Sequence, residues 1–367
     1  MKFTIPRETL LTPLQQVVGV IEKRQTMPIL SNVLMTFGEG WIELTGTDLE
    51  IQLVARAQTD MTVSGSVTVP AKKLLDIIRL LPDRSPLQIE CKEDRFSIRC
   101  GGGRYTLATL PVENYPAFDS GASELEVLVP ADALRTALDK TMFAMAQQDV
   151  RYYLNGILLD LEGATLRTVS SDGHRLALYQ ETFEAPFASN RQVIIPRKGV
   201  QELARLLADA DDTLTIRIAP NTIGVDLGAI SFSAKLVEGR FPDFRRVLPS
   251  ELNRFYKVDR DELKRALTRV SVLSDEKIKT ISLEISDDGV MQLKTHKSEQ
   301  EDAEEQLSVD AEGGGVSVGF NAHYLLDAVN NVDSDVAKLS FTESASSCLI
   351  EDAVDTRFKS IVMPMRL

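Results

Sequence analysis

The sequence predicts an α+β protein of three repeated domains, each with two helices packed on antiparallel sheets. Helix starts recur at an almost constant interval, the residues between them alternate with the period of a strand, and polar breaks fall after every second unit. The starts follow Pro6, Pro70, Pro130, Pro196, Asp259 and Asn321, at intervals of 64, 60, 66, 63 and 62 residues. A fixed interval of this length is typical of a repeat architecture.

Each helix start is followed by an amphipathic stretch. Four starts are a β-branched residue followed by proline, which suits the first helical turn because its missing N–H would have no partner there. Asp259 and Asn321 replace proline at the last two starts, and side chains of these types accept a hydrogen bond from a free N–H. After the second start, Leu74, Ile77 and Ile78 recur at helical spacing and predict one apolar face.

Strand-like segments separate the helices. Residues 41–45, 87–90 and 214–218 alternate between apolar and polar side chains, which is the period of a strand with one buried face. Short turns such as 161–163 and 286–289 lie between such segments. Each unit of roughly 63 residues is therefore predicted to hold a strand, one helix and several antiparallel strands.

The units are expected to work in pairs. One helix on a few strands cannot bury its apolar stripe, whereas two units can, and pairing gives domains of a usual size. Polar breaks at 120–123 and 248–251 agree with this pairing, and residues 45–49 resemble residues 169–173 one domain later. The predicted domains are 1–122, 123–250 and 251–367.

Charge is segregated between the two kinds of element. The predicted helices cover 7–21, 71–81, 131–145, 197–208, 260–273 and 322–332. They hold 13 Lys and Arg against 8 Asp and Glu, which gives the helices a net charge of +5. Because the whole chain has a net charge of −13, the remaining residues carry −18. A cationic helix layer could hold a phosphate backbone without reading its sequence. Ordinary solvated helix faces are the alternative explanation.

The composition argues against a membrane or metal protein. No apolar run approaches the ~20 residues that span a bilayer. The three cysteines form no CxxC pair, which suits a reducing cytoplasm and makes a zinc site unexpected. We expect a cytoplasmic protein that uses no metal and no cofactor.

Motifs for catalysis are missing. Asp172 and His174 could suggest an acid–base pair, but no nucleophile motif accompanies them, so a turn between strands is the favoured interpretation. Gly101 to Gly103 lack the GK[ST] ending of a phosphate loop and predict a hairpin turn. The acidic run 299–305 predicts a solvated or interfacial strand rather than a cation site. We therefore do not expect an enzyme.

Six strings taken together resemble a known family over the whole chain. They are residues 45–50, 148–156, 171–176, 196–199, 239–243 and 362–367. In this order they closely resemble the bacterial DNA sliding clamp, the beta subunit of the replicative DNA polymerase holoenzyme.

The resemblance implies a processivity factor without a catalytic site. It implies three clamp domains that form half of a closed ring, completed by a head-to-tail homodimer with helices lining the central hole. A clamp loader would open the ring with ATP. The ring would encircle duplex DNA without sequence preference. It would tether replicative and repair DNA polymerases through short linear peptide motifs.

The resemblance also assigns site residues by position. The peptide-binding cleft maps to Leu154, Ser171, Gly173, His174, Arg175, Leu176, Pro242, Arg246, Val247, Ser347, Val362, Met363, Pro364, Met365 and Arg366. DNA contacts map to Arg24, Gln148, Tyr152, Tyr153, Arg197 and Lys198. The dimer interface maps to Arg95, Arg104, Tyr105, Leu107, Val272, Leu273, Glu299, Glu301 and Glu304.

Two departures from the family pattern fall at the expected dimer edge. Gly102 and Gly103 stand where related clamps often carry another arginine, and residues 295–298 depart from the usual neutral approach to the acidic run. Two other functions are compatible with the residues alone. One is a repeat-built scaffold that binds peptides but no DNA, and the other is a hydrolase that uses Asp172 and His174.

Overall fold

The computed structural model describes residues 1–21, 27–208, 210, 212–274, 279–295, 301–343 and 347–366. The chain divides into two compact units. The first unit contains Met1–Arg135 and Lys198–Leu236, and the second contains Thr136–Arg197 and Val237–Leu367. No helix in the described ranges is long and apolar enough to cross a membrane.

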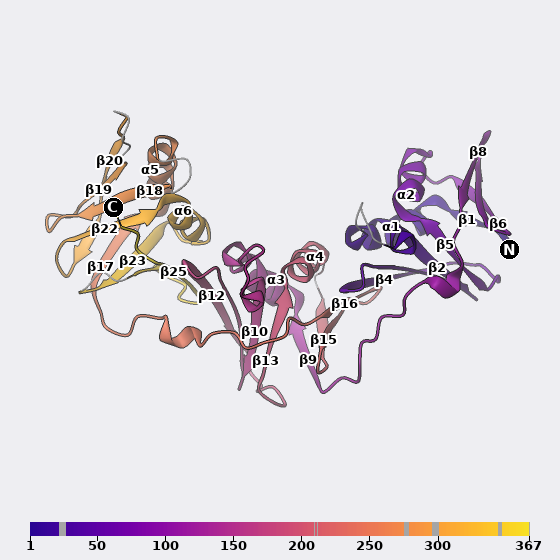
Figure 1. Ribbon diagram of the computed structural model, residues 1–367, viewed down its shortest axis with the longest axis horizontal. Helices are drawn as coiled ribbons and strands as arrows, with labels where there is room; N and C mark the ends of the chain where they lie inside the picture. Colours follow the sequence, from indigo (N-terminus) through magenta and orange to yellow (C-terminus); the bar gives the residue numbers. More distant parts are fainter. Residues whose placement is uncertain are drawn as a thin grey trace. The chain divides into compact units, whose positions relative to one another are not determined.

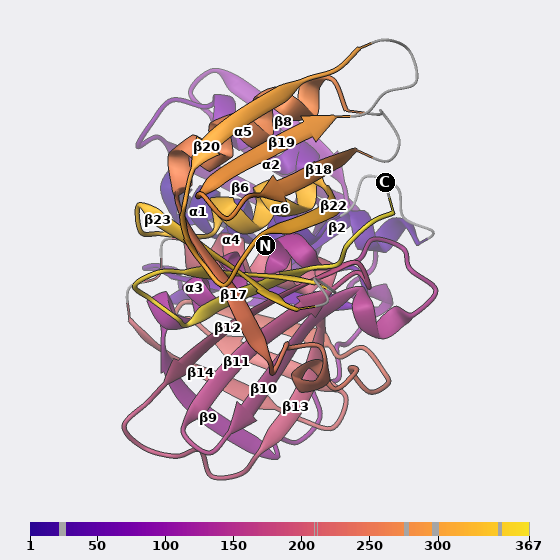
Figure 2. The ribbon, with the colours of Figure 1, turned by 90° about the vertical axis from the view of Figure 1, so that its left-hand side faces the viewer.

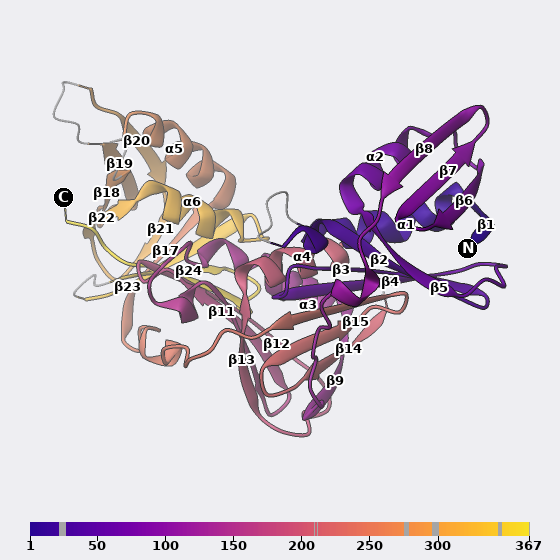
Figure 3. The same ribbon diagram turned by 45° about the vertical axis from the view of Figure 1, so that its right-hand side comes forward.

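The first unit contains two antiparallel sheets. Its strands are β1 (Lys2–Pro6), β2 (Asn32–Gly38), β3 (Trp41–Thr47), β4 (Ile51–Gln58), β5 (Gly65–Pro70), β6 (Pro86–Lys92), β7 (Arg95–Cys100), β8 (Gly103–Ala108), β9 (Leu125–Pro130), β14 (Thr213–Ile218), β15 (Thr222–Asp226) and β16 (Ile230–Lys235). The small sheet has the order β1-β6-β7-β8, and the large one β5-β2-β3-β4-β16-β15-β14-β9. Figure 3 shows two helices, α1 (Arg7–Val17) and α2 (Ala71–Leu80), side by side in this unit.

The second unit repeats this plan. Its strands are β10 (Gly156–Glu162), β11 (Thr165–Ser171), β12 (Arg175–Thr182), β13 (Arg191–Pro196), β17 (Leu252–Asp259), β18 (Thr280–Ile285), β19 (Val290–Thr295), β20 (Glu304–Ser308), β21 (Asp310–Glu312), β22 (Val316–Asn321), β23 (Val336–Thr342), β24 (Cys348–Asp352) and β25 (Phe358–Val362). The large sheet has the order β13-β10-β11-β12-β25-β24-β23-β17-β21, and the small one β20-β19-β18-β22. Helices α5 (Arg260–Val272) and α6 (Ala322–Asn330) pack together beside the small sheet (Figure 2).

The strands of the middle repeat are shared between the units. β9 and β14–β16 extend the sheet of the first repeat, whereas β10–β13 extend the sheet of the third (Figure 1). Each large sheet therefore crosses from one repeat to the next, through β4 and β16 in the first unit and through β12 and β25 in the second. These two crossings are the junctions at which a site could draw residues from two repeats.

The six predicted helix starts are confirmed. The remaining two helices are α3 (Ala131–Asp139) and α4 (Arg197–Leu207), and every helix begins directly after its predicted signal. Each signal residue is the last residue of a strand, so the prolines precede the helices rather than forming their first positions. The Asp259 carboxylate accepts a hydrogen bond from the Glu262 N–H at 2.8 Å. Asn321 accepts one from the His323 N–H at 2.9 Å.

All six predicted helices end earlier than expected, and two of them end at least four residues earlier. α1 ends at Val17 and α3 at Asp139, and 3₁₀ turns follow at Val18–Val20 and Met142–Ala144. After α3, the hydroxyl groups of Thr141 and Thr168 both donate to the Ala137 carbonyl oxygen, each at 2.7 Å. They occupy the acceptor that another helical turn would need, so the helix stops there.

Candidate functional site

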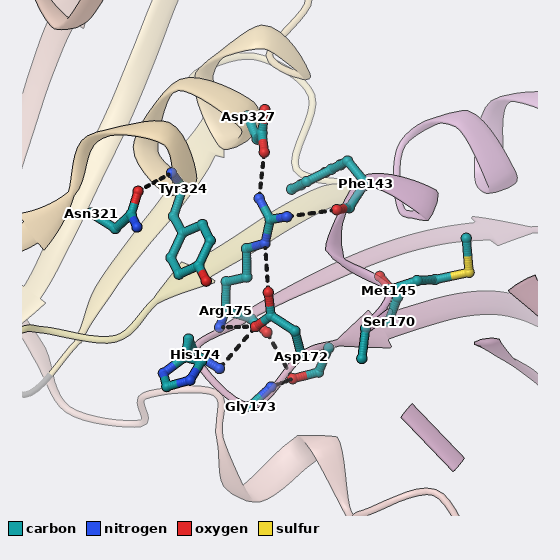
Figure 4. A network of polar contacts seen from close by, with 12 residues as sticks. Phe143, Met145, Ser170, Asp172, Gly173, His174, Arg175, Asn321, Tyr324 and Asp327 are labelled. Atoms are coloured by element: carbon teal, nitrogen blue, oxygen red, sulfur yellow. Dashed lines mark hydrogen bonds and ion pairs between the residues drawn. The ribbon is translucent and has the colours of Figure 1, made fainter. Parts of the chain in front are cut away.

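The junction of the second unit contains a tight turn between β11 and β12. The Ser171 hydroxyl donates to the Arg175 carbonyl oxygen at 2.7 Å and accepts from the Gly173 N–H at 3.1 Å. One carboxylate oxygen of Asp172 accepts from the N–H groups of His174 and Arg175, at 2.9 and 3.0 Å (Figure 4). Gly173 has a φ of +89°, which glycine adopts without steric cost.

This turn directs Arg175 into the unit. Its guanidinium donates to the carboxylates of Asp172 and Asp327, at 3.1 and 2.5 Å, and to the Phe143 carbonyl oxygen at 2.8 Å. It also lies 4.5 Å from the ring centroid of Tyr324 (Figure 4). The Arg175 side chain, 11% exposed, thus joins the turn to α6 and to the segment after α3. The guanidinium donors of Arg175 are therefore occupied within the protein, where they stabilise the junction.

The geometry of Asp172 and His174 differs from an acid–base pair. The Asp172 carboxylate bonds to backbone N–H groups and to Arg175, while the imidazole of His174 lies 6.4 Å from the ring of Tyr324. Asp172 therefore shapes the turn rather than orienting the His174 ring.

A row of mostly apolar residues crosses the outer face of the large sheet beside this turn. In cross-strand register the row consists of Leu176, Ile361, Leu349, Ser340 and Phe255. We call it the second-unit rung. Its first four side chains are at most 4% exposed. Among the described residues, the buried Ser340 hydroxyl lacks a hydrogen-bond partner. The rung forms an apolar floor contributed by five strands.

The segment that links the middle and third repeats covers part of this floor. Phe241 and Phe244 are 7% and 3% exposed and belong to one buried cluster with Leu176, Leu349 and Ile361. Further members are Ala146, Leu154, Leu158, Val169, Leu178 and Ile194, with Tyr153, Val237, Val247, Leu248, Leu252 and Met363 packed against them. Beside the cluster lies a hollow of about 780 Å³, lined by residues 246–253, Thr342, Glu343 and Ser347.

The structure brings most of the assigned cleft residues to this place. Leu154, Leu176, Val247 and Met363 belong to the cluster or pack on it, and Arg246 and Ser347 line the hollow. Ser171, Gly173, His174 and Arg175 form the turn, Val362 pairs with Arg175 in the sheet, and Pro242 follows Phe241 on the exposed side. The tail then leaves the turn: the Met363 N–H donates to His174 O and the Met365 N–H to Gly319 O, with Pro364 and Arg366 exposed.

Sequence reasoning missed the middle of the floor. Leu349, Ser340 and Phe255 carry no motif, and only the strand register shows that they are neighbours. It also missed Asp327 and Tyr324, which hold Arg175 from α6. The partner of Arg175 lies 152 residues away along the chain, so no local pattern could have indicated it.

The residues assigned to DNA have different surroundings. Arg24 lies outside the described residues. The Arg197 guanidinium donates to the Met145 carbonyl oxygen at 3.0 Å, and the Lys198 ammonium pairs with the Asp48 carboxylate, so both contribute to their own units. Tyr152 is 74% exposed.

The loop that carries Gln148, Tyr152 and Tyr153 is internally bonded. Gln148 has a φ of +54°, and the Arg151 side chain and N–H lower the pKa of Asp149 to about 2. Tyr153 packs on the buried cluster.

Exposed cations on the helices also lie outside that assigned set. Lys264 and Arg265 are exposed on α5 and have no ion pair within the described ranges. Their neighbour Arg269 is engaged, because its guanidinium binds both carboxylate oxygens of Glu305, at 2.6 and 2.7 Å.

The residues assigned to the dimer interface lie on two edge strands and one helix end. Arg95, Arg104, Tyr105 and Leu107 belong to β7 and β8, and β8 is the edge of the small sheet of the first unit. Glu304 belongs to β20, the edge of the small sheet of the second unit, and Glu301 precedes it. Val272 is 75% exposed at the end of α5, and Leu273 follows it. Glu299 lies outside the described residues.

Three family models together match nearly the whole chain. They describe the N-terminal, central and C-terminal domains of the DNA polymerase III beta subunit and match residues 1–119, 128–243 and 245–366. The chain belongs to the beta sliding clamp family. The beta sliding clamps of Pseudomonas aeruginosa and Escherichia coli K12 are each 43% identical to it over 368 residues, covering 100% of both chains.

Solved clamp structures have the same fold. A crystal structure of the DNA polymerase III subunit beta from Pseudomonas aeruginosa matches with a TM-score of 0.96 and 42% identity, covering 100% of both chains. A sliding clamp from the same organism bound to griselimycin matches with a TM-score of 0.96, 43% identity and the same coverage. The predicted α+β fold of three repeated clamp domains is confirmed.

Family membership also defines the type of protein. The chain is a DNA polymerase processivity factor, an accessory subunit rather than an enzyme. This excludes the hydrolase alternative.

Proposed function

We propose that two copies of this chain form a closed head-to-tail ring around duplex DNA in the cytoplasm and tether DNA polymerases through a cleft on the second unit. The repeats of this ring are residues 1–122, 123–250 and 251–367. The observation that carries the proposal is the apolar second-unit rung, which the linking segment partly covers and which lies beside an open hollow.

The cleft suits a short peptide with apolar side chains. Its floor is buried and apolar, and Val247 and Met363 lie partly exposed at its margin. Methionine adapts its shape to different ligands, so one cleft can accept several partner peptides. The relative bound to griselimycin supports a ligand site on this fold. We propose that replicative and repair polymerases and the clamp loader bind here in turn.

The ring would close through complementary edges. An edge strand offers unpaired N–H and C=O groups to another chain. β8 carries Arg104, with Arg95 on the neighbouring strand, and β20 carries Glu304. Opposite charges of this kind select partner and orientation. A head-to-tail contact gives a finite assembly only if its rotation closes.

DNA would be held by charge rather than by sequence. Lys264 and Arg265 on α5 are exposed and belong to the cationic set predicted on the helices. Contacts to phosphate alone give weak binding that falls as salt rises. The ring, not the affinity, would keep the clamp on DNA.

Retention on DNA circles tests the proposal. The chain is loaded on nicked circular DNA with the clamp loader and ATP, and the circle is then linearised. We expect retention on the circle and loss after linearisation, because a closed ring slides off a free end. Equal retention on both forms would contradict topological binding. Light scattering should give twice the 40.6 kDa chain mass, whereas a monomer would contradict the ring.

A charge reversal tests whether the cations of α5 contact DNA. Lys264→Glu with Arg265→Glu should reduce loading and polymerase processivity while griselimycin binding stays unchanged. Unchanged processivity would mean that these two side chains do not contact DNA.

Removal of residues 363–367 tests the cleft. We expect loss of polymerase and loader binding with the dimer intact in gel filtration. A monomer after this deletion would mean that the tail is structural.

A further inference from the structure

A charged network lies at one end of the buried cluster in the second unit. On the outer face of the large sheet, the apolar row Ile194, Leu158, Val169 and Leu178 belongs to the cluster. One step along the strands the row becomes polar: Gln192, Asp160 and Arg167. Asp160 accepts from Gln192 at 3.0 Å and from Arg167 at 3.3 Å. Its side chain is 3% exposed, so these partners offset the loss of water around a charge.

Arg245 of the linking segment completes this network. Its guanidinium donates to the Glu162 carboxylate at 2.8 Å and to Asp160 at 3.4 Å. Arg167 also donates to Glu162, at 2.8 Å, so two arginines share two carboxylates. The guanidinium of Arg245 lies 4.9 Å from the ring centroid of Phe244, which is buried in the cluster.

The segment that Arg245 holds is short and has little structure of its own. Residues Phe244–Arg246 form a single 3₁₀ turn. Its backbone hydrogen bonds are local, for example from the Val247 N–H to Phe244 O at 3.0 Å. One turn of this kind is not stable alone, so side-chain contacts must hold its position. Phe244 supplies the apolar contact and Arg245 the charged one.

We propose that Arg245, through Asp160 and Glu162, is a positioning residue for the cleft: it fixes the 244–246 turn and thereby the place of Val247 at the margin. This inference rests on the proposed role of the cleft. Because the turn is preorganised, a ligand does not have to order it on binding, which improves affinity without any contact to Arg245. Among the described residues of the first unit, the corresponding cross-strand row does not form a comparable apolar floor, so this unit does not need the device.

Arg217 offers a matched control. It lies on β14 of the first unit and also donates to two carboxylates, Glu126 at 3.1 Å and Asp226 at 3.3 Å. Its side chain is 46% exposed, against 47% for Arg245. The two arginines therefore share exposure and type of partner but differ in their relation to the cluster.

The experiment compares Arg245→Gln, Arg245→Lys and Arg217→Gln in the full chain. Griselimycin binding is measured by calorimetry, and amide hydrogen exchange is measured at residues 246–248. We expect Arg245→Gln to weaken binding about three- to tenfold, a usual effect for coupled neighbours, and to speed exchange at Val247 and Leu248. Arg245→Lys keeps the charge but loses the planar guanidinium with its paired donors. Its affinity and its exchange rate should lie between those of the wild type and those of Arg245→Gln. Arg217→Gln should change neither quantity.

Three results would overturn the inference. They are wild-type affinity in Arg245→Gln, an equal loss of affinity in Arg217→Gln, and a loss of affinity with unchanged exchange at 247 and 248. The last would mean that Arg245 touches the ligand directly. If the wild-type chain does not bind griselimycin, the proposed cleft fails instead, and the exchange measurement still shows whether Arg245 fixes the turn.

Discussion

The two junctions of this chain have the same strand register, but one presents mostly apolar side chains on its outer face and the other mostly polar ones. In the second unit the rung across the outer face is Leu176, Ile361, Leu349, Ser340 and Phe255. The equivalent rung of the first unit is Gln52, Ser233, Gly224, Arg217 and Glu126. Its last two side chains are exposed and form an ion pair at 3.1 Å. The difference teaches that the repeat supplies the backbone frame, while five side chains on one face make one junction apolar and the other polar.

The turns beside the two rungs agree in more detail. Thr47 and Asp48 make the same hydrogen bonds as Ser171 and Asp172, to groups two to four residues ahead. Leu49 stands where Gly173 stands, with a φ of +79°. The first turn pairs with Lys198 of α4, whereas the second sends Arg175 to α6. Similar turns are therefore joined to the helix layer by unrelated ion pairs.

Exchanging one rung residue should give the largest effect. Leu176→Gln places in the second unit the residue that the first unit carries. We expect a loss of about 2–4 kcal/mol of unfolding free energy, because an apolar side chain is removed and an amide is buried without partners. Griselimycin binding should be lost as well. Urea unfolding and calorimetry measure both, and the reverse exchange, Gln52→Leu, should cost less than about 0.5 kcal/mol. Equal costs would contradict the difference between the junctions.

The second unit should be the more sensitive to acid at its β24–β25 turn. Burial opposes ionisation of Asp352, yet the backbone N–H groups of Ser334, Asp355 and Val354 and the Ser334 side chain hold its pKa well below the usual range. The Asp352 carboxylate accepts these three backbone hydrogen bonds and one from the Asp333 N–H at 2.8 to 3.0 Å. A lowered pKa means that this stabilisation is present above the unfolded pKa of about 4 and is lost as pH falls further. Leu227, at the equivalent place in the first unit, has no charge to lose.

Asp352→Asn tests this difference. We expect a loss of about 2 kcal/mol near neutral pH, since the hydrogen bonds to a charged acceptor are weakened. The gap between variant and wild type should narrow as pH falls below about 4. Urea unfolding across this pH range measures it, and a gap that stays constant would show that the carboxylate charge is not responsible.

The two turns should respond differently to side chains at their left-handed position. Gly173→Ala should cost about 1 kcal/mol, because alanine tolerates this φ poorly. The added Cβ would also lie 2.8 Å from a guanidinium nitrogen of Arg151, which must move. Leu49→Gly should change stability by less than about 0.5 kcal/mol, since relief of strain offsets the greater freedom of glycine in the unfolded chain. Thermal unfolding measures both, and a large loss in Leu49→Gly would mean that the leucine side chain is needed.

The smallest change concerns the polar member of the apolar rung. Ser340→Ala removes a buried hydroxyl that has no partner in the described part of the chain. We expect stability to stay level or rise by up to about 1 kcal/mol, because an unpaired buried polar group is costly. A clear loss in urea unfolding would indicate that the hydroxyl is bonded in solution.

Much of the fold was predictable because its signals are local. The helix starts, the caps at Asp259 and Asn321, and the turn at 171–175 each depend on residues within a few positions of one another. The turn residues of the cleft were reached through the strings that resemble the clamp family. The early helix ends at Val17 and Asp139 were not predicted. The end at Asp139 depends on a hydroxyl group from β11, which is distant in the sequence.

The partners of the assigned cations were not predictable in the same way. Arg175, Arg197 and Lys198 read alike as exposed basic residues, yet each is held by carbonyl or carboxylate oxygens of its own unit. Whether a cation is paired depends on residues that are distant in the sequence, so the local pattern does not show it. Lys264 and Arg265 differ from these three residues because they are exposed in the folded chain.

The period of about 63 residues, the strand alternation and the capping residues are properties of short segments, so they can be seen in the chain before it folds. The proposed cleft is not of this kind. Its floor joins Leu176 to Ile361 and Leu349 through strand register, and register is set by packing of the whole sheet. Neither rung can be recognised in the linear sequence, because its residues come from five separate strands. Only the folded sheets show that the second-unit rung is mostly apolar and buried, whereas the first-unit rung ends in an exposed ion pair.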